Sequence, residues 1–301
     1  MVKILGYIGF SLMSLLVSLY MTFPGAAVGQ RIAHEVRQAT QGSVALSFED
    51  LELYRLTGIS AEGVQVELRR GAQDTQTFAL DEATVRLQIL SLLMLEPVVS
   101  ADLKLGDGSI EAEIGQPEEG EYEVKVDIAE VGLASAPMLA EMVGLPMSGV
   151  VTGNVETAIK KDPRKNEGQL SLQIAGSSVG PGSVGGLTLP KMNLGNLELQ
   201  VNVDKGRIEI SEFKQAGGDI EARLSGHSNL RSSLLSSSVD ACVQFKADAG
   251  FLAKNPKMKT IMDLAKIKLK KGESDFLHLP LSGTFSRPRL RGGLCRKQRT
   301  R

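Results

Sequence analysis

The sequence predicts a mainly β protein, in which an N-terminal transmembrane helix precedes an elongated, curled antiparallel sheet with two or three short helices. The first observation behind this prediction is an uncharged run of 20 residues near the N-terminus. The second is the alternation of apolar and polar residues along most of the remaining chain, which is the period of a strand. Composition agrees, because the 301 residues include 32 Gly, no Trp and only 4% aromatic residues. The sheet is expected to form a groove, a roll or a partly open barrel.

The uncharged run extends from Ile4 to Phe23 and is long enough to cross about 30 Å of hydrocarbon as a helix. A cleaved signal peptide is the alternative, because small residues follow at 25–27, but its apolar region is usually only about 7–15 residues long. Lys3 and the amino terminus favour a cytoplasmic N-terminus and an exported main domain. The residues assigned to the membrane anchor are Ile4, Leu5, Tyr7, Ile8, Phe10, Leu12, Leu15, Leu16, Val17, Leu19, Tyr20 and Phe23.

Strands are predicted wherever the alternation is regular, with roughly ten to thirteen strands in all. Glycine-containing turns separate several of them, as at Asp204-Lys205-Gly206. Such short connections predict antiparallel neighbours, because a parallel return needs a crossover of about a dozen residues. The clearest alternating segments are 64–68, 110–114, 122–128, 170–174, 197–204, 220–225 and 239–248.

Three helices are predicted outside the anchor, at 25–41, 135–143 and 255–270. The third is expected to begin with Asn255 as N-cap and Pro256 at the first helical position. Its apolar stripe is formed by Met258, Ile261, Met262, Ala265 and Leu269. Three helices are too few to cover a dozen strands, so the apolar side of the sheet must close on itself or curl into a groove.

Two interpretations of that apolar side stay open. It is either a core filled by its own side chains or a groove that holds something apolar, such as a phospholipid. The groove candidates are Tyr122, Val124, Val126, Leu197, Leu199, Val201, Val243 and Phe245.

Charge is unevenly distributed along the chain, although the net charge is only −1. The segment 287–301 carries seven Lys and Arg and no acidic residue, which leaves the rest of the chain at about −8. It is expected to be a disordered tail that either solubilises the terminus or contacts anionic lipid or an acidic partner. The domains predicted are a transmembrane anchor at 1–24, a periplasmic β domain at 25–286 with a possible subdivision near 160–190, and the tail. A near-neutral chain argues against a nucleic-acid partner.

No motif for catalysis stands out. The segment 180–185 fits G-x-G-x-x-G, but Pro190 follows too closely for the helix that this motif needs. His227 has serines nearby without the strand, elbow and helix of a hydrolase nucleophile. The sequence therefore predicts a non-enzymatic protein with no catalytic residues, no cofactor and no metal. Whether Cys242 and Cys295 pair or stay free thiols is left open.

Two segments carry a resemblance to a known family. They are GLTLPKMNLGNLELQVNVDKGRIEISEFKQAGGDIEARLSGHSNL at 186–230 and LPLSGTFSRPRLRGG at 279–293. With the N-terminal apolar run, they resemble the type II secretion system protein N (GspN) family of the δ-proteobacterial type. More distantly, the chain is similar to AsmA-like proteins.

The GspN resemblance implies a single-pass protein of the bacterial inner membrane with its main domain in the periplasm. It implies a part in assembling or supporting the type II protein secretion apparatus, with other secretion-system envelope components as partners. The AsmA-like resemblance implies an alternative, a β-groove that binds or transfers lipid. Neither family implies catalytic residues.

Overall fold

The computed structural model describes residues 2–40, 42–55, 57–69, 75–89, 91, 96–135, 145–184, 187–231, 236–268, 276–285, 287–290 and 294–295. Contacts divide the chain into two compact units, Met1–Leu105 and Gly106–Arg301. The subdivision that the sequence suggests near 160–190 lies inside the second unit. Strands dominate both units, which confirms the prediction of a mainly β protein with few short helices.

The first unit begins with two helices and continues with strands. These are α1 (Val2–Met21), α2 (Gly25–Ala39), β1 (Val44–Ser47), β2 (Asp50–Tyr54), β3 (Gly58–Arg69), β4 (Thr75–Leu87) and β5 (Val98–Leu105). The strands lie in the order β1, β3, β4, β5, and β2 pairs with the other half of β3. Every pair is antiparallel. α2 contacts β1 and β2, and its Gly29 is buried.

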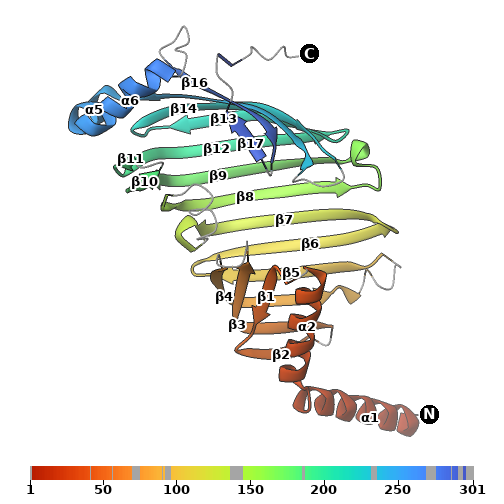
Figure 1. Ribbon diagram of the computed structural model, residues 1–301. Coiled ribbons are helices and arrows are strands. Elements are labelled where there is room, and N and C mark those ends of the chain that lie inside the picture. Colours follow the sequence, from red (N-terminus) through yellow and green to blue (C-terminus); the bar gives the residue numbers. More distant parts are fainter. Residues whose placement is uncertain are drawn as a thin grey trace. The chain divides into compact units, whose positions relative to one another are not determined.

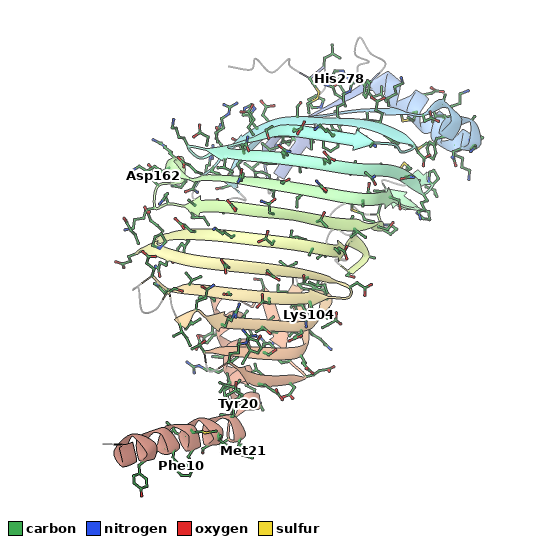
Figure 2. The ribbon with its side chains drawn as sticks, turned by 180° about the vertical axis from the view of Figure 1, so that it is seen from behind. Phe10, Tyr20, Met21, Lys104, Asp162 and His278 are labelled. Carbon is green, nitrogen blue, oxygen red and sulfur yellow. A yellow bond between two sulfur atoms is a disulfide. The ribbon has the colours of Figure 1, made fainter. Side chains whose placement is uncertain are left out.

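α1 covers most of the segment predicted to be a membrane anchor. Several of its side chains are strongly exposed, including Tyr7 at 75% and Leu15 at 67%. Phe10, labelled in Figure 2, is also 75% exposed. Within the described residues, however, no helix combines the length and the apolar character that crossing a membrane requires. The prediction of a transmembrane anchor is therefore unsupported by the structure. Six anchor residues have side chains outside the described ones, namely Ile4, Leu5, Ile8, Leu12, Leu16 and Leu19.

Among the described residues, the second unit contains more strands than the first (Figure 1). Its first half contains β6 (Gly108–Glu118), β7 (Glu121–Gly132), the 3-10 turn η1 (Leu133–Ser135), β8 (Met147–Ile159), the 3-10 turn η2 (Pro163–Lys165) and β9 (Glu167–Val179). Its second half contains β10 (Gly182–Val184), β11 (Leu187–Leu189), β12 (Met192–Asp204), β13 (Arg207–Ala216), β14 (Ile220–Asn229), β15 (Ser238–Ala247), α5 (Ala249–Lys254), α6 (Pro256–Lys268), β16 (Leu277–Thr284) and β17 (Arg287–Leu290).

The strand order of this unit follows the chain almost without exception. It runs β6, β7, β8, β9, β12, β13, β14, β15, β16, β17. β10 and β11, which follow β9 in the sequence, form a separate two-stranded sheet, and β9 pairs directly with β12. The pairs are antiparallel, which confirms the prediction drawn from the short turns. Among the described strands, β17 ends this order and pairs with β16 alone, so the sheet is not closed.

Each alternating segment predicted from the sequence lies in a strand. The segments at 64–68, 110–114, 122–128, 170–174, 197–204 and 220–225 lie in β3, β6, β7, β9, β12 and β14, and the last lies in β15 up to Ala247. The strands nevertheless outnumber the prediction, because β1, β10, β11 and β17 have only three or four residues. Segments that short contain too few alternations to be recognised.

The hairpin between β12 and β13 shows how a turn fixes the register. Asp204 pairs with Arg207, so Lys205 and Gly206 are the two central residues. Both have positive φ, 48° and 70°, as a type I′ turn requires. This turn matches the twist of the flanking strands, and it sets the apolar residues of β12 opposite those of β13.

The predicted helices agree with the structure where they can be compared. The helices at 25–41 and 255–270 are confirmed as α2 and α6, whereas the helix predicted at 135–143 lies, apart from Ser135, outside the described residues. The sequence missed α5. Asn255 directly precedes Pro256, the first residue of α6, and its carbonyl accepts the Lys259 N–H at 3.1 Å, which confirms its predicted place at the start of that helix. Its side-chain amide donates to the Phe251 carbonyl at 3.0 Å, so the same residue also caps the end of α5.

The C-terminal segment departs from the prediction of a disordered tail. Residues Arg287–Leu290 form β17, which pairs with β16. Cys295 is joined to Cys242 of β15 by a disulfide, which answers the question that the sequence left open. The remaining basic residues of this segment, at 291, 296, 297, 299 and 301, lie outside the described ones.

The buried core of the second unit lies where α5 and α6 pack against strand ends (Figure 1). Its buried members are Met192, Ala247, Phe251, Met258, Met262 and Leu277, with Leu189, Ile220, Phe245 and Leu252 packed against them. We call this set the helix-end core. Leu277 is its most deeply buried side chain, at 1% exposure. α5 is fixed here by Asp248, whose carboxylate accepts the Phe251 N–H at 3.0 Å.

Candidate functional site

The second unit places rows of apolar side chains across neighbouring strands. In one row Val126 of β7 pairs with Val155, Val155 with Leu170, Leu170 with Val201, and Val201 with Ile210 of β13. Directly paired residues project to the same side of an antiparallel sheet. The row therefore crosses five strands on a single face.

Adjacent rows extend this surface in both directions along the strands. Leu172 pairs with Leu199, and Leu199 pairs with Phe213, while Ile128 and Val124 flank Val126 on β7. The residues called the apolar face from here on are Val124, Val126, Ile128, Val155, Leu170, Leu172, Leu199, Val201, Ile210 and Phe213.

The register puts all eight groove candidates on the same side. Tyr122 alternates with Val124 on β7, and Leu197 alternates with Leu199 on β12. Ile208 of β13 pairs with Ser228, which pairs with Val239, so the alternating Val243 and Phe245 of β15 lie on this side too. Phe245, however, packs against the helix-end core. It belongs to the covered end of this side of the sheet.

Exposure distinguishes the two ends of this side. All ten members of the apolar face keep part of their surface exposed, and none is fully buried. The end opposite α5 and α6 is the most open, with Ile114 at 41%, Tyr122 at 40% and Ile159 at 41% exposure. The sequence left open whether the apolar side of the sheet is filled by its own side chains. This side is covered by packed side chains at the helix-end core, and it is partly exposed elsewhere.

The opposite side of these strands is charged and polar. Lys125, Glu156, Gln169 and Asn202 form one paired row across β7, β8, β9 and β12. A hollow of about 480 Å³ lies at this place, and most of its lining residues belong to the polar side. It is therefore not a pocket in the apolar face.

The first unit has an apolar hollow of its own, with a volume of about 530 Å³. Its apolar lining consists of Phe23, Leu53, Ile59, Val85, Leu87 and Val99. Val85 and Leu87 are 38% and 40% exposed, so the hollow is open to the surroundings. Phe23 lies two residues beyond α1, which places the hollow beside the start of the folded domain.

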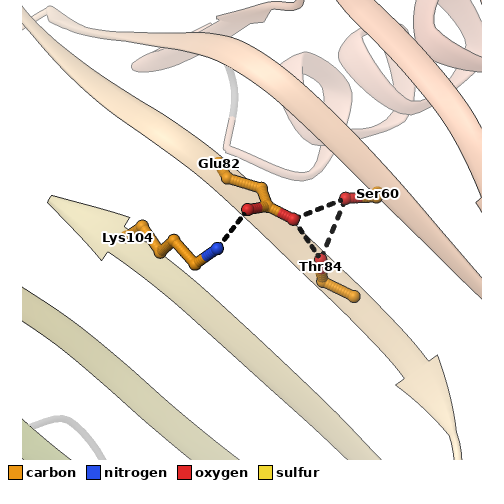
Figure 3. Close-up of polar contacts among 4 residues, drawn as sticks. All are labelled: Ser60, Glu82, Thr84 and Lys104. Carbon is orange, nitrogen blue, oxygen red and sulfur yellow. Dashed lines mark hydrogen bonds and ion pairs between the residues drawn. The ribbon is translucent and has the colours of Figure 1, made fainter.

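A hydrogen-bonded group of polar side chains lies on the first unit (Figure 3). Lys104 Nζ donates to Glu82 Oε2 at 2.6 Å, and Ser60 and Thr84 donate to Glu82 Oε1 at 3.2 and 3.4 Å. The pKa of the Glu82 carboxyl lies below its ordinary value of 4.5, first because of the bond from Lys104 and then because of the bond from Ser60. The same contact raises the pKa of Lys104.

This group predicts a small, pH-dependent contribution to stability. A lowered carboxyl pKa means that the unfolded chain binds the proton more tightly, so the contribution is present above pH 4.5 and is lost as pH falls through the lower folded-state pKa. Glu82→Gln is expected to lower the melting temperature slightly at pH 7. At strongly acidic pH the variant and the wild type are expected to have the same melting temperature. Thermal unfolding of both proteins from pH 7 to pH 3 measures this, and a difference that stays constant over the range contradicts it.

Two further ion pairs change the pKa values of their side chains. Lys160 contacts Glu121 at 2.8 Å, and the hydrogen bond between them lowers the Glu121 pKa and raises that of Lys160. Lys214 has a raised pKa because of its hydrogen bond to Glu212. In the described part of the chain, then, these pKa shifts come from ion pairs at the surface.

Sequence reasoning missed one cluster of potential ligands. Cys242 of β15, His278 of β16 and Cys295 each place a ligand atom within 4.8 Å of the others (Figure 2 labels His278). The three residues are far apart in the sequence and fit no spacing motif. Only the β15–β16 pairing and the return of the chain after β17 bring them together.

Comparisons with known proteins do not assign the chain to a family: no family model, no curated protein and no solved structure matches it.

Proposed function

We propose that this protein is a non-enzymatic component of the bacterial cell envelope whose apolar face binds the acyl chains of a phospholipid. The observation that carries the proposal is the partial exposure of every member of that face. Contiguous exposed apolar surface favours association with an apolar partner, by roughly 25 cal/mol for each Å² removed from water. The rows run across several strands, which suits a long flexible chain better than a compact ligand.

The proposed site of attachment to the membrane is α1. Ile4 to Phe23 contains no charged residue, and the described side chains of α1 are widely exposed. The apolar hollow of the first unit includes Phe23, directly after this helix. A lipid leaving the inner membrane would meet that hollow first, while the main domain lies in the periplasm.

Native mass spectrometry of the full chain, released gently from detergent, tests the proposal. We expect a population carrying phospholipid, identified by its headgroup and acyl masses after dissociation. A chain that carries no lipid, and acquires none when it is incubated with phospholipid vesicles, contradicts acyl-chain binding.

A second candidate function is favoured by the sequence itself. The segments 186–230 and 279–293 resemble the GspN family, and they cover β12 to β14 and much of the region from β16 to β17. In this proposal the protein supports assembly of the type II secretion apparatus through contacts with other envelope components. Deleting its gene is expected to reduce the export of secreted enzymes. Undiminished secretion in the deletion strain contradicts this role and leaves the lipid proposal standing.

A further inference from the structure

The disulfide and the neighbouring imidazole occupy one face of the β15–β16 pair. Cys242 pairs with Pro280, and His278 lies two residues before Pro280 on the same strand, so Cys242 and His278 are diagonal neighbours on the same face. β17 then returns along β16 and leads the chain to Cys295. Three different segments thus each supply one side chain to the cluster.

The imidazole is oriented toward Cys295. His278 Nδ1 accepts the backbone N–H of Cys295 at 3.1 Å, so its lone pair points at the segment that carries the second sulfur. Cys242 is buried at 9% exposure, while His278 and Cys295 are half-buried. The sulfurs and the ring nitrogen therefore lie together at a partly shielded place on the surface.

We propose that the reduced form of this cluster is a binding site for Zn²⁺, with Cys242, Cys295 and His278 as ligands. Two thiolates and a neutral imidazole are ligands that zinc prefers, at about 2.3 Å for sulfur and 2.0 Å for nitrogen. The ligand atoms already lie within 4.8 Å of one another, so small side-chain movements bring them around one ion. The fourth tetrahedral position is left for water.

Disulfide and metal exclude each other, because both use the same two sulfurs. A dithiol reductant breaks the Sγ–Sγ bond and supplies two electrons and two protons, and is itself oxidised to a disulfide. Zn²⁺ then displaces both thiol protons to solvent, and the Nδ1 lone pair turns from the Cys295 N–H to the ion. The complex of two thiolates and one divalent ion is neutral overall, which suits the buried position of Cys242.

Cobalt titration of the full chain, reduced and kept free of oxygen, tests the site. Co²⁺ occupies tetrahedral zinc sites and reports thiolate ligands through a sulfur-to-cobalt charge-transfer band. We expect this band to saturate at one equivalent, to disappear when Zn²⁺ is added, and to be absent from the oxidised chain. A reduced, folded chain without the band contradicts the proposal.

Cobalt binding by single-residue variants tests whether His278 is a ligand. His278→Ala is expected to weaken cobalt binding at least about tenfold, the scale of the loss when a metal site is perturbed. His34→Ala, in α2 of the first unit, is the matched control and is expected to bind as wild type. Equal affinity in His278→Ala and wild type, with identical spectra, removes His278 from the site and overturns the proposal.

Reduction also breaks a covalent link, so the fold of the reduced chain is followed by far-ultraviolet circular dichroism. If reduction unfolds part of the chain, binding to the folded state requires that Zn²⁺ restore the spectrum. Failure of Zn²⁺ to restore it contradicts the proposal as clearly as a missing cobalt band. The test uses no lipid and no secretion assay, so its outcome is independent of the proposed function.

Discussion

Replacing Leu199 with Glu is expected to lower the amount of phospholipid bound by the full chain at least about tenfold, since a carboxylate against an acyl chain costs more than the roughly 1.4 kcal/mol that a tenfold loss represents. Leu199 lies in the middle of the apolar face, paired with Leu172 on one side and Phe213 on the other. A carboxylate at this position cannot avoid the bound chain, because both neighbouring strands fix the direction of the side chain.

The matched control is Gln200→Glu. Gln200 is the next residue on β12, projects to the polar side and is exposed. It gains the same charge at the same place in the chain, and α1 is unchanged in both variants. Bound lipid per mole of chain, measured by native mass spectrometry, should fall in Leu199→Glu alone. Equal amounts in the two variants contradict binding at the apolar face.

Leu277→Ala is expected to destabilise the protein by about 2–5 kcal/mol, the usual cost of removing a large buried side chain without collapse of the cavity. Leu277 is 1% exposed and packs in the helix-end core with methionines of α6. It also pairs with Phe245 in the sheet. Its truncation therefore loosens the helices and the strand ends together.

Leu279→Ala provides the comparison for this variant. Leu279 is two residues further along β16 on the same side, but it remains partly exposed. Its truncation removes the same atoms from a less enclosed place, so it is expected to cost clearly less. Urea unfolding of oxidised samples measures both midpoints. Equal losses of stability would mean that the helix-end core is not tightly packed.

The strands of this protein could be predicted because their signal is local. Along β12 or β7, the alternation of apolar and polar residues shows which side chains belong to each face of the strand. Turns such as Lys205-Gly206 mark where a strand ends. The same alternation assigned the groove candidates to a single side before any register was known. Short strands and α5 escaped prediction, because three to six residues contain too little of any period.

What the sequence could not supply depends on contacts between distant segments. Whether the apolar side is covered depends on where α5 and α6 pack, and alternation alone does not distinguish Phe245 from Val126. The cluster of Cys242, His278 and Cys295 likewise exists only once β15, β16 and the segment after β17 lie together. The second role of Asn255, at the end of α5, could not be predicted because the pattern contained no sign of a helix before it.

In the second unit the spatial order of the strands follows their order in the sequence, and this affects how the unit unfolds. Each strand touches little beyond its two neighbours, so cooperativity is passed along the ladder step by step, as in repeat proteins. At the C-terminal side the helices and the Cys242–Cys295 link tie several strands together. Local opening among β6 to β8 therefore need not disturb β14 to β16, and these first strands of the unit can separate transiently while the rest of it stays native.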